Sequence, residues 1–347
     1  MQYTQLRHTD LNLSRLMLGS MTWGSQNTQD EGFMQMDHAV ANGINCIDTA
    51  EMYPTNPITA ETQGETERII GRWIANRGRR DDLIIATKVS GQGLMHVRDG
   101  IPISAATMRL AIEESLRALA TDYIDIYQLH WPNRGSYAFR KNWHYDPSDQ
   151  DSSATAEHML EVLEMMQILK QEGKIRYPGL SNESCWGVMR WLGIAEHREL
   201  PRMVTVQNEY SLLCRLYDLD MAEMSHHEGV GLLAFSPLAA GLLSGKYGPD
   251  ETPAGSRRSI TSNLGGRTTD RVWPAIAAYQ ALARDHGLDP AQMALAWCLT
   301  RPFMTSAIFG ATSMQQLDTA IGAATLELSE DVMQGIADIH KAHPLPY

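Results

Sequence analysis

The sequence predicts an α/β protein whose residues 1–347 form one domain, a (β/α)8 TIM barrel of eight parallel strands. Two observations predict this fold. Short apolar runs alternate with longer amphipathic runs along nearly the whole chain, and there are about eight such pairs. A doubly wound sheet is the alternative, but it would carry a nucleotide site at its first strand–helix turn. That turn reads LGSMTWGS from Leu18, which is not the G-x-G-x-x-G fingerprint of such sites.

The expected strands are short apolar runs, many of them rich in β-branched residues. They are RLMLG from Arg15, NCID from Asn45, LIIATK from Leu83, YIDIYQLH from Tyr123, IRYPGL from Ile175, MVTVQN from Met203, GLLAFS from Gly231 and TSAIFG from Thr305. Helices are expected between them, for example over residues 104–120 and 154–174. In the second of these, apolar side chains recur at helical spacing, at Met159, Val162, Leu163, Met166 and Leu169. Asp289 followed by Pro290 is typical of a helix start.

Three segments lie outside this alternation. Residues 3–14 predict a small β-hairpin that turns at Thr9 and Asp10 and caps the bottom of the barrel. Residues 131–153 and 237–267 are longer than ordinary loops and follow the fourth and seventh strands. In a barrel both long loops would lie at the C-terminal ends of the strands, where active sites form.

Composition limits the functional classes. The formal net charge is −12, from 29 Lys and Arg against 41 Asp and Glu, which argues against broad nucleic-acid binding. The four cysteines lie far apart without a C-x-x-C pair, so we expect free thiols and no metal site. The N-terminal residues lack the apolar core of a signal peptide, and no apolar run reaches the ~18 residues of a membrane span. We therefore expect a cytoplasmic protein; the sequence leaves its oligomeric state open.

Polar residues end most of the expected strands. They are Asp48, Lys88, His130, Ser181 with Asn182, Gln207 with Asn208, and Ser236 after Phe235, while Gly310 ends the last strand. A single histidine at a strand end more often makes a structural hydrogen bond. In a barrel, however, all these side chains would converge on one mouth, and the joint pattern indicates a site.

Four of the residues could make a proton donor. A free tyrosine titrates near ~10, but a lysine ammonium beside the Tyr53 phenol would favour the phenolate and lower its pKa. An ionised Asp48 would hold Lys88 in place and keep it charged. His130 could orient a carbonyl oxygen or relay the proton. We expect Asp48 to position the lysine and Tyr53 to be the acid.

Several motifs resemble the aldo-keto reductase superfamily over essentially the whole chain. They are IDTAEMY, ATKVS, YIDIYQLHWP, GLSNES, VQNEYSLL and AFSPLAAGLLSGKY, and their order and spacing also match. The AEMYP motif and the long mid-chain loop resemble the bacterial Tas-type reductases. The resemblance implies a barrel that binds NADPH without a Rossmann domain and reduces small aldehydes or ketones. It maps the catalytic tetrad of the family onto Asp48, Tyr53, Lys88 and His130.

The resemblance also implies a cofactor groove. Ser181, Asn182 and Gln207 would bind the nicotinamide carboxamide, and Phe235 would stack on the ring. The pyrophosphate would lie along small residues and a lysine, at Ser236, Leu238, Gly241, Ser244 and Lys246. Either Arg257 or Arg258 would close over it. Without the resemblance, Phe235 would be interpreted as a core aromatic and the arginines as part of an exposed loop.

The adenosine end departs from the family pattern. Gly310, Thr312 and Gln316 match, but Ala320 occupies the position where relatives often have Asn, and no Lys or Arg occurs between Gly310 and Ala320. An arginine clamp for the 2′-phosphate is therefore missing from this segment. NADPH is the expected cofactor, and NADH is not excluded.

The sequence leaves the substrate pocket and the class of function with alternatives. Trp23 and Trp131, with Trp143 or Tyr145, predict an aromatic substrate pocket near Tyr53, although packing of the long loop explains some of them equally well. The protein is expected to be an NADP(H)-dependent oxidoreductase. The alternative is a binding module that senses the redox state of its cofactor, as channel β-subunits of this superfamily do. A third interpretation, a barrel enzyme of another reaction class, is supported by the fold alone.

Overall fold

In the computed structural model, which describes residues 1–347, eight parallel strands close into a barrel in the order β10-β3-β4-β5-β6-β7-β8-β9. The strands are β3 (Leu16–Gly19), β4 (Cys46–Asp48), β5 (Ile84–Val89), β6 (Ile124–Leu129), β7 (Ile175–Ser181), β8 (Thr205–Glu209), β9 (Gly231–Phe235) and β10 (Met304–Phe309). The predicted TIM barrel is confirmed. Every neighbouring pair is parallel, so the C-terminal ends of all eight strands meet at one mouth.

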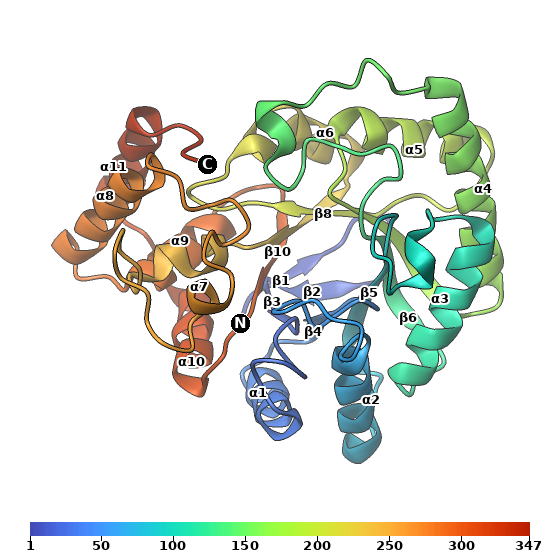
Figure 1. The fold of residues 1–347 in the computed structure, drawn as a ribbon, viewed down its shortest axis with the longest axis horizontal. Helices are drawn as coiled ribbons and strands as arrows, with labels where there is room; N and C mark the ends of the chain where they lie inside the picture. The colour runs from blue at the N-terminus through green and yellow to red at the C-terminus, as the bar shows by residue number, and fades with distance from the viewer.

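Helices surround the barrel (Figure 1). They are α1 (Gln29–Ala41), α2 (Glu65–Arg77), α3 (Ala105–Ala118), α4 (Ser152–Gln171), α5 (Cys185–His197), α6 (Asp220–Glu228), α7 (Arg257–Ile260), α8 (Val272–Asp285), α9 (Pro290–Leu299), α10 (Met314–Gly322) and α11 (Glu330–Ala342). In Figure 1, α8 and α11 lie side by side at one edge of the barrel. None of the helices combines the length and the apolar composition that crossing a bilayer requires.

Local sequence signals explain where these helices begin. The predicted start at Asp289 is confirmed, because its carboxylate accepts hydrogen bonds from the backbone N–H groups of Ala291 and Gln292, with Pro290 in the first turn. The predicted face of α4 is also confirmed, since its apolar residues are buried against the barrel. Burial of this face supplies most of the stability of such a helix.

The N-terminal hairpin closes the bottom of the barrel, as predicted. β1 (Tyr3–Gln5) and β2 (Asn12–Ser14) pair antiparallel, and the connection includes Thr9 and Asp10. Leu6, Leu11 and Leu13 are buried in one apolar cluster with strand residues that point into the barrel. The hairpin thereby removes the apolar lower end of the barrel from water.

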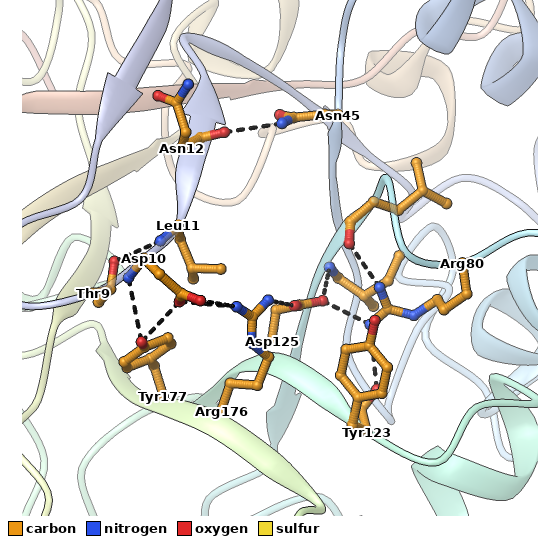
Figure 2. Close-up of polar contacts among 12 residues, drawn as sticks. Thr9, Asp10, Leu11, Asn12, Asn45, Arg80, Tyr123, Asp125, Arg176 and Tyr177 are labelled. Atoms are coloured by element: carbon orange, nitrogen blue, oxygen red, sulfur yellow. Dashed lines mark hydrogen bonds and ion pairs between the residues drawn. The ribbon is translucent and has the colours of Figure 1, made fainter.

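A polar network fixes the hairpin to this end (Figure 2). Asp125 of β6 is fully buried and accepts hydrogen bonds from Arg80 Nη2 at 2.6 Å and Arg176 Nη1 at 2.5 Å. Arg176 also contacts the exposed carboxylate of Asp10 at 2.8 Å, and the Tyr177 hydroxyl donates to the same carboxylate at 2.8 Å. One chain of charges thus runs from the barrel strands to the hairpin.

The two long loops follow the predicted strands and lie at the mouth. Residues 130–151 connect β6 to α4, and the chain after β9 contains two short helical segments, η4 (Ala239–Ser244) and α7, before α8 begins. The second loop therefore contains more helical structure than its Gly- and Ser-rich sequence suggests.

Candidate active site

A cavity of about 1020 Å³ occupies the C-terminal end of the barrel. Most of the strand-end residues predicted to converge line it, together with residues of both long loops; Asn208 does not, because its side chain is hydrogen-bonded to the backbone of Glu183. Its lining includes Asp48, Tyr53, His130, Ser181, Asn182, Gln207, Phe235, Ser236, Leu238, Gly241, Ser244, Lys246, Arg257, Gly310, Thr312 and Gln316. Lys88 lies behind the lining: it is one residue before the end of β5 and is 0% exposed.

Lys88 and Asp48 form a buried ion pair at the floor of the cavity. The Lys88 ammonium donates to Asp48 Oδ1 at 2.8 Å, to Oδ2 at 2.7 Å and to the Thr49 carbonyl at 2.7 Å. Gln207 Nε2 donates to Asp48 Oδ1 at 2.8 Å, so the carboxylate is held from two sides. Burial alone would lower the pKa of Lys88, but Asp48 and Tyr53 outweigh it, so its pKa is raised and the lysine is charged.

Tyr53 is held over this ion pair by a tight turn after β4. Its backbone N–H donates to the Ala50 carbonyl at 3.0 Å, and the Lys88 Nζ atom lies 5.1 Å from the centroid of its ring. Burial raises the pKa of the phenol, and although Lys88 lowers it, the net shift is upward. The expected lowering of this pKa is therefore wrong in its net direction. Tyr53 holds its proton at neutral pH, as a proton donor must.

His130 borders the phenol on the other side. Its ring is edge-on to Tyr53, with ring centroids 5.9 Å apart and an interplanar angle of 70°. Burial and the charge of Lys88 hold the pKa of His130 well below its ordinary value, so the imidazole is neutral. Its Nδ1 atom is buried and has no hydrogen-bond partner in the protein. A neutral imidazole still has one N–H group, which can donate a hydrogen bond to the oxygen of a carbonyl compound.

Amide and hydroxyl groups continue the lining next to His130. Asn182 Nδ2 donates to the His130 carbonyl at 2.9 Å and to Ser181 Oγ at 3.0 Å, and Ser181 Oγ donates to the Gln207 carbonyl at 2.9 Å. Asn182 Oδ1 is buried without a partner. Because a buried acceptor without a partner costs about 1–3 kcal/mol, this atom marks a place where a ligand N–H would be stabilising.

More cationic than acidic side chains line the cavity, although the chain as a whole is acidic. Its lining has five cationic side chains against two carboxylates, Asp48 and Asp289; the cations are Arg140, Lys141, Lys246, Arg257 and Arg267. Gly241 adopts φ +95°, and a Cβ there would lie 3.1 Å from Lys246 Cε. This glycine therefore lets the backbone turn tightly beside the lysine.

The two adjacent arginines of α7 differ in what they face. Arg257 lines the cavity, has no carboxylate partner and leaves its Nε atom buried without an acceptor. Burial and the nearby Arg267 lower the pKa of Arg257 to about 10. Arg258 instead donates to the carbonyls of Pro249 at 2.8 Å and Glu251 at 2.9 Å, within its own loop. Of the two candidates, only Arg257 reaches the cavity.

The two tryptophans predicted for the substrate pocket also differ. Trp131 lines the cavity, and its indole N–H donates to the Gln92 carbonyl at 3.2 Å. Trp23 does not line it: the side chain is 0% exposed in the main core, and its indole N–H donates to Gln35 Oε1 at 2.8 Å. The prediction for Trp23 is wrong because the turn after β3 directs this indole against the helices, away from the mouth.

Sequence reasoning missed a charged cluster at the mouth. Glu209, the last residue of β8, accepts from Arg140 Nη1 at 2.8 Å and from Arg267 Nε at 2.8 Å. Each arginine comes from a different long loop, so this carboxylate joins both loops to the barrel. The available signal was an acidic residue at a strand end within VQNEYS.

Comparisons with known proteins show the family of the chain. The family model described as "Aldo/keto reductase family" matches residues 15–341. "Protein tas" of Escherichia coli is 46% identical over 100% of this chain and 99% of its own length. The "Uncharacterized oxidoreductase YrpG" of Bacillus subtilis is 32% identical over 98% of this chain and 96% of its own. A "Probable voltage-gated potassium channel subunit beta" of Arabidopsis thaliana is 29% identical over 91% and 89%. The chain belongs to the aldo/keto reductase family and is Tas-like over its full length.

Proposed function

We propose that this protein reduces small aldehydes or ketones to alcohols with NADPH, and that Tyr53 donates the proton. The observation that carries the proposal is the grouping at the cavity floor. A phenol that burial keeps protonated lies beside a fully buried Lys88–Asp48 ion pair and a neutral histidine. Membership of an oxidoreductase family supports the same reaction class.

Each of the four side chains has a role in this proposal. Tyr53 protonates the carbonyl oxygen, and the ammonium of Lys88 stabilises the negative charge left on the phenol oxygen. Asp48 keeps Lys88 charged and fixed, so no reorganisation is needed when that charge develops. His130 hydrogen-bonds the carbonyl oxygen and orients it towards Tyr53.

The residues present fit a nicotinamide dinucleotide. The unpaired Asn182 Oδ1 would accept from the carboxamide, assisted by Ser181 and Gln207, and Phe235 would cover one face of the ring. Lys246 and Arg257 would hold the phosphates. Bound NADPH would supply the hydride. Arg257, a buried cation without a carboxylate partner, would contact the pyrophosphate, which NADPH and NADH share. NADPH is therefore proposed from the family resemblance, and NADH stays the alternative because no Lys or Arg lies between Gly310 and Ala320.

Apolar side chains line the cavity beside Tyr53. They include Met52, Ile58, Leu94, Trp131 and Phe139. Such walls exclude water from the reacting carbonyl and favour an aromatic or medium-chain aldehyde as the small carbonyl substrate.

A second candidate function is redox sensing. The similarity to the Arabidopsis potassium-channel β-subunit favours a barrel that binds the cofactor and reports its oxidation state to another protein. The complete set of Asp48, Tyr53, Lys88 and His130 around one cavity favours turnover instead.

The test follows the loss of reduced-nicotinamide absorbance with para-nitrobenzaldehyde, with NADPH and separately with NADH. We expect wild-type turnover, and a fall of about 10²- to 10⁴-fold in kcat for Tyr53→Phe with cofactor binding retained. Tyr177→Phe is the matched control, since it removes a phenol at the opposite end of the barrel. Cofactor binding without turnover over a broad panel of aldehydes and ketones would favour the sensor. Absence of cofactor binding would exclude both functions.

A further inference from the structure

A buried ion pair between Glu51 and Arg98 adjoins the turn that carries Tyr53. Glu51 is 4% exposed and lies two residues before Tyr53. Arg98 Nη2 donates to Glu51 Oε1 at 2.7 Å, and Arg98 Nη1 is paired with Oε2. The backbone N–H of Ser90, just after β5, also donates to Oε1. Both carboxylate oxygens are therefore engaged, and the geometry is bidentate.

The backbone of the turn explains why Glu51 matters for Tyr53. After β4 the chain still pairs with β5, through Thr49 N–H to the Ala86 carbonyl at 2.9 Å and a longer bond from Glu51 N–H to the Lys88 carbonyl at 3.3 Å. Beyond Glu51 the chain leaves β5 and turns back over Lys88. At this point the Glu51 carboxylate binds Ser90 and Arg98, so it connects the turn to the segment that follows β5.

Arg98 belongs to the loop between β5 and α3, part of which lines the cavity. Gln92, Gly93 and Leu94 of this loop line the cavity, and the Gln92 carbonyl accepts the indole N–H of Trp131. Arg98 itself has φ +48° and Asp99 has φ +55°, in the left-handed region that residues other than glycine rarely adopt. Such a backbone persists where surrounding contacts hold it, and the Glu51 carboxylate is one such contact.

The ion pair thus joins two parts of the site that are separate in sequence. One is the turn with the Tyr53 phenol, and the other is the loop that supports Trp131 beside His130. Stability alone does not account for the pair well, because burying a bidentate ion pair contributes little net free energy compared with apolar side chains of the same size.

We infer that Glu51 and Arg98 are positioning residues, which fix the Tyr53 phenol relative to the substrate wall at Trp131. This inference rests on the proposed function. Neither side chain reaches the cavity, so neither contacts the substrate or the cofactor. Misplacing a proton donor by about 1 Å can cost about 10²-fold in rate.

The experiment measures kcat, the KM for NADPH and the solvent deuterium isotope effect on kcat with para-nitrobenzaldehyde, for wild type, Glu51→Gln and Arg98→Lys. We expect Glu51→Gln to lower kcat by about 10- to 100-fold with the KM for NADPH within about twofold. The solvent isotope effect should rise, because a misplaced phenol makes proton transfer more rate-limiting. Arg98→Lys keeps the charge but not the bidentate contact. Its kcat and its solvent isotope effect should lie between those of wild type and Glu51→Gln.

Asp125→Asn is the matched control. It also breaks a buried carboxylate–arginine contact, but at the other end of the barrel. It should lower the melting temperature and leave kcat and the isotope effect of the folded enzyme unchanged. A crystal structure of Arg98→Lys should show the Tyr53 hydroxyl displaced, which gives a readout independent of turnover.

The outcomes separate this inference from the proposed function. If wild type turns over and Tyr53→Phe does not, while both Glu51→Gln and Arg98→Lys retain kcat and the isotope effect within about twofold, the positioning role is wrong and the proposed function stands. If Asp125→Asn lowers kcat as much as Glu51→Gln does, the effect is general destabilisation and the inference is also overturned. Absence of wild-type turnover overturns both proposals.

Discussion

Charged side chains gather at both ends of the barrel, but the two ends differ in whether these side chains have partners of opposite charge. At the bottom, the buried Asp125 faces Arg80 and Arg176, and Arg176 continues to Asp10 on the hairpin (Figure 2). Each charged group there has an opposite charge within contact distance. At the mouth, Arg257 has no carboxylate partner, and Asn182 Oδ1 and His130 Nδ1 are buried without hydrogen bonds.

This difference separates a structural network from a binding site. A buried polar group without a partner destabilises the empty protein, since its hydration is lost and not replaced. The bottom network pairs every one of its charges with an opposite charge, leaves only Arg80 Nε buried without a hydrogen bond, and holds the hairpin in place. At the mouth, several buried polar atoms around one cavity have no partner, and a ligand with matching groups would remove this energetic cost. Several unpaired groups gathered around one cavity therefore indicate the site more sharply than charge alone.

Removing the central carboxylate at the bottom should have the largest effect on stability. Asp125→Asn leaves Arg80 and Arg176 facing each other without their shared negative charge. We expect the free energy of unfolding to fall by about 3 kcal/mol, near the lower limit for a buried pair because Arg176 is partly exposed. Denaturant titration measures this change.

Asp10→Asn is the control for Asp125→Asn, because Asp10 contacts the same Arg176 but its side chain is 69% exposed. Exposed pairs contribute about 0.2–1 kcal/mol, so this variant should unfold almost like wild type. Equal losses in the two variants would contradict the view that burial of Asp125 makes the network stabilising.

At the mouth, Arg257→Met should act in opposite directions on binding and on stability. Loss of a charged hydrogen bond to phosphate should weaken NADPH binding by about 10- to 100-fold, since such bonds contribute about 1.5–3 kcal/mol. The cofactor-free protein should gain stability, because the pKa of Arg257, lowered to about 10, indicates that its charge is poorly accommodated. Fluorescence titration with NADPH and thermal unfolding without it measure the two effects.

Arg258→Met provides the matched control one residue away. Its contacts lie within the loop, so we expect reduced stability of that loop and NADPH affinity within a few-fold of wild type. Weaker NADPH binding in Arg258→Met than in Arg257→Met would show that the loop conformation controls affinity, and it would exclude a direct phosphate contact by Arg257.

The sequence predicted the strands, the start of α9 and most of the residues around the cavity, because these depend on local patterns and on motif order. It could not choose between Arg257 and Arg258, which differ only in the direction each takes from a four-residue helix. It placed Trp23 in the cavity wrongly, because the direction of that indole depends on how the chain packs it against α1 and α2. It also gave the wrong net direction for the pKa of Tyr53, since burial is a property of the folded molecule.

The smallest expected effect is the pH dependence of the mouth. The pKa of Tyr53 is raised from its ordinary value near 10, so the phenol stays protonated up to alkaline pH. The pKa of His130 is lowered well below 6.5, so the imidazole stays neutral down to acidic pH. Neither group changes its charge between about pH 7 and pH 9, and kcat at saturating substrate should vary by less than about twofold over that range.

Initial rates in overlapping buffers of constant ionic strength measure this profile. Activity should fall only at alkaline pH, where Tyr53 loses its proton, because an ionised phenol cannot act as the acid. A sigmoidal change centred near pH 6.5 that disappears in His130→Gln would contradict the prediction. It would show that His130 titrates at its ordinary value and that the buried mouth is better hydrated than its unpaired polar atoms indicate.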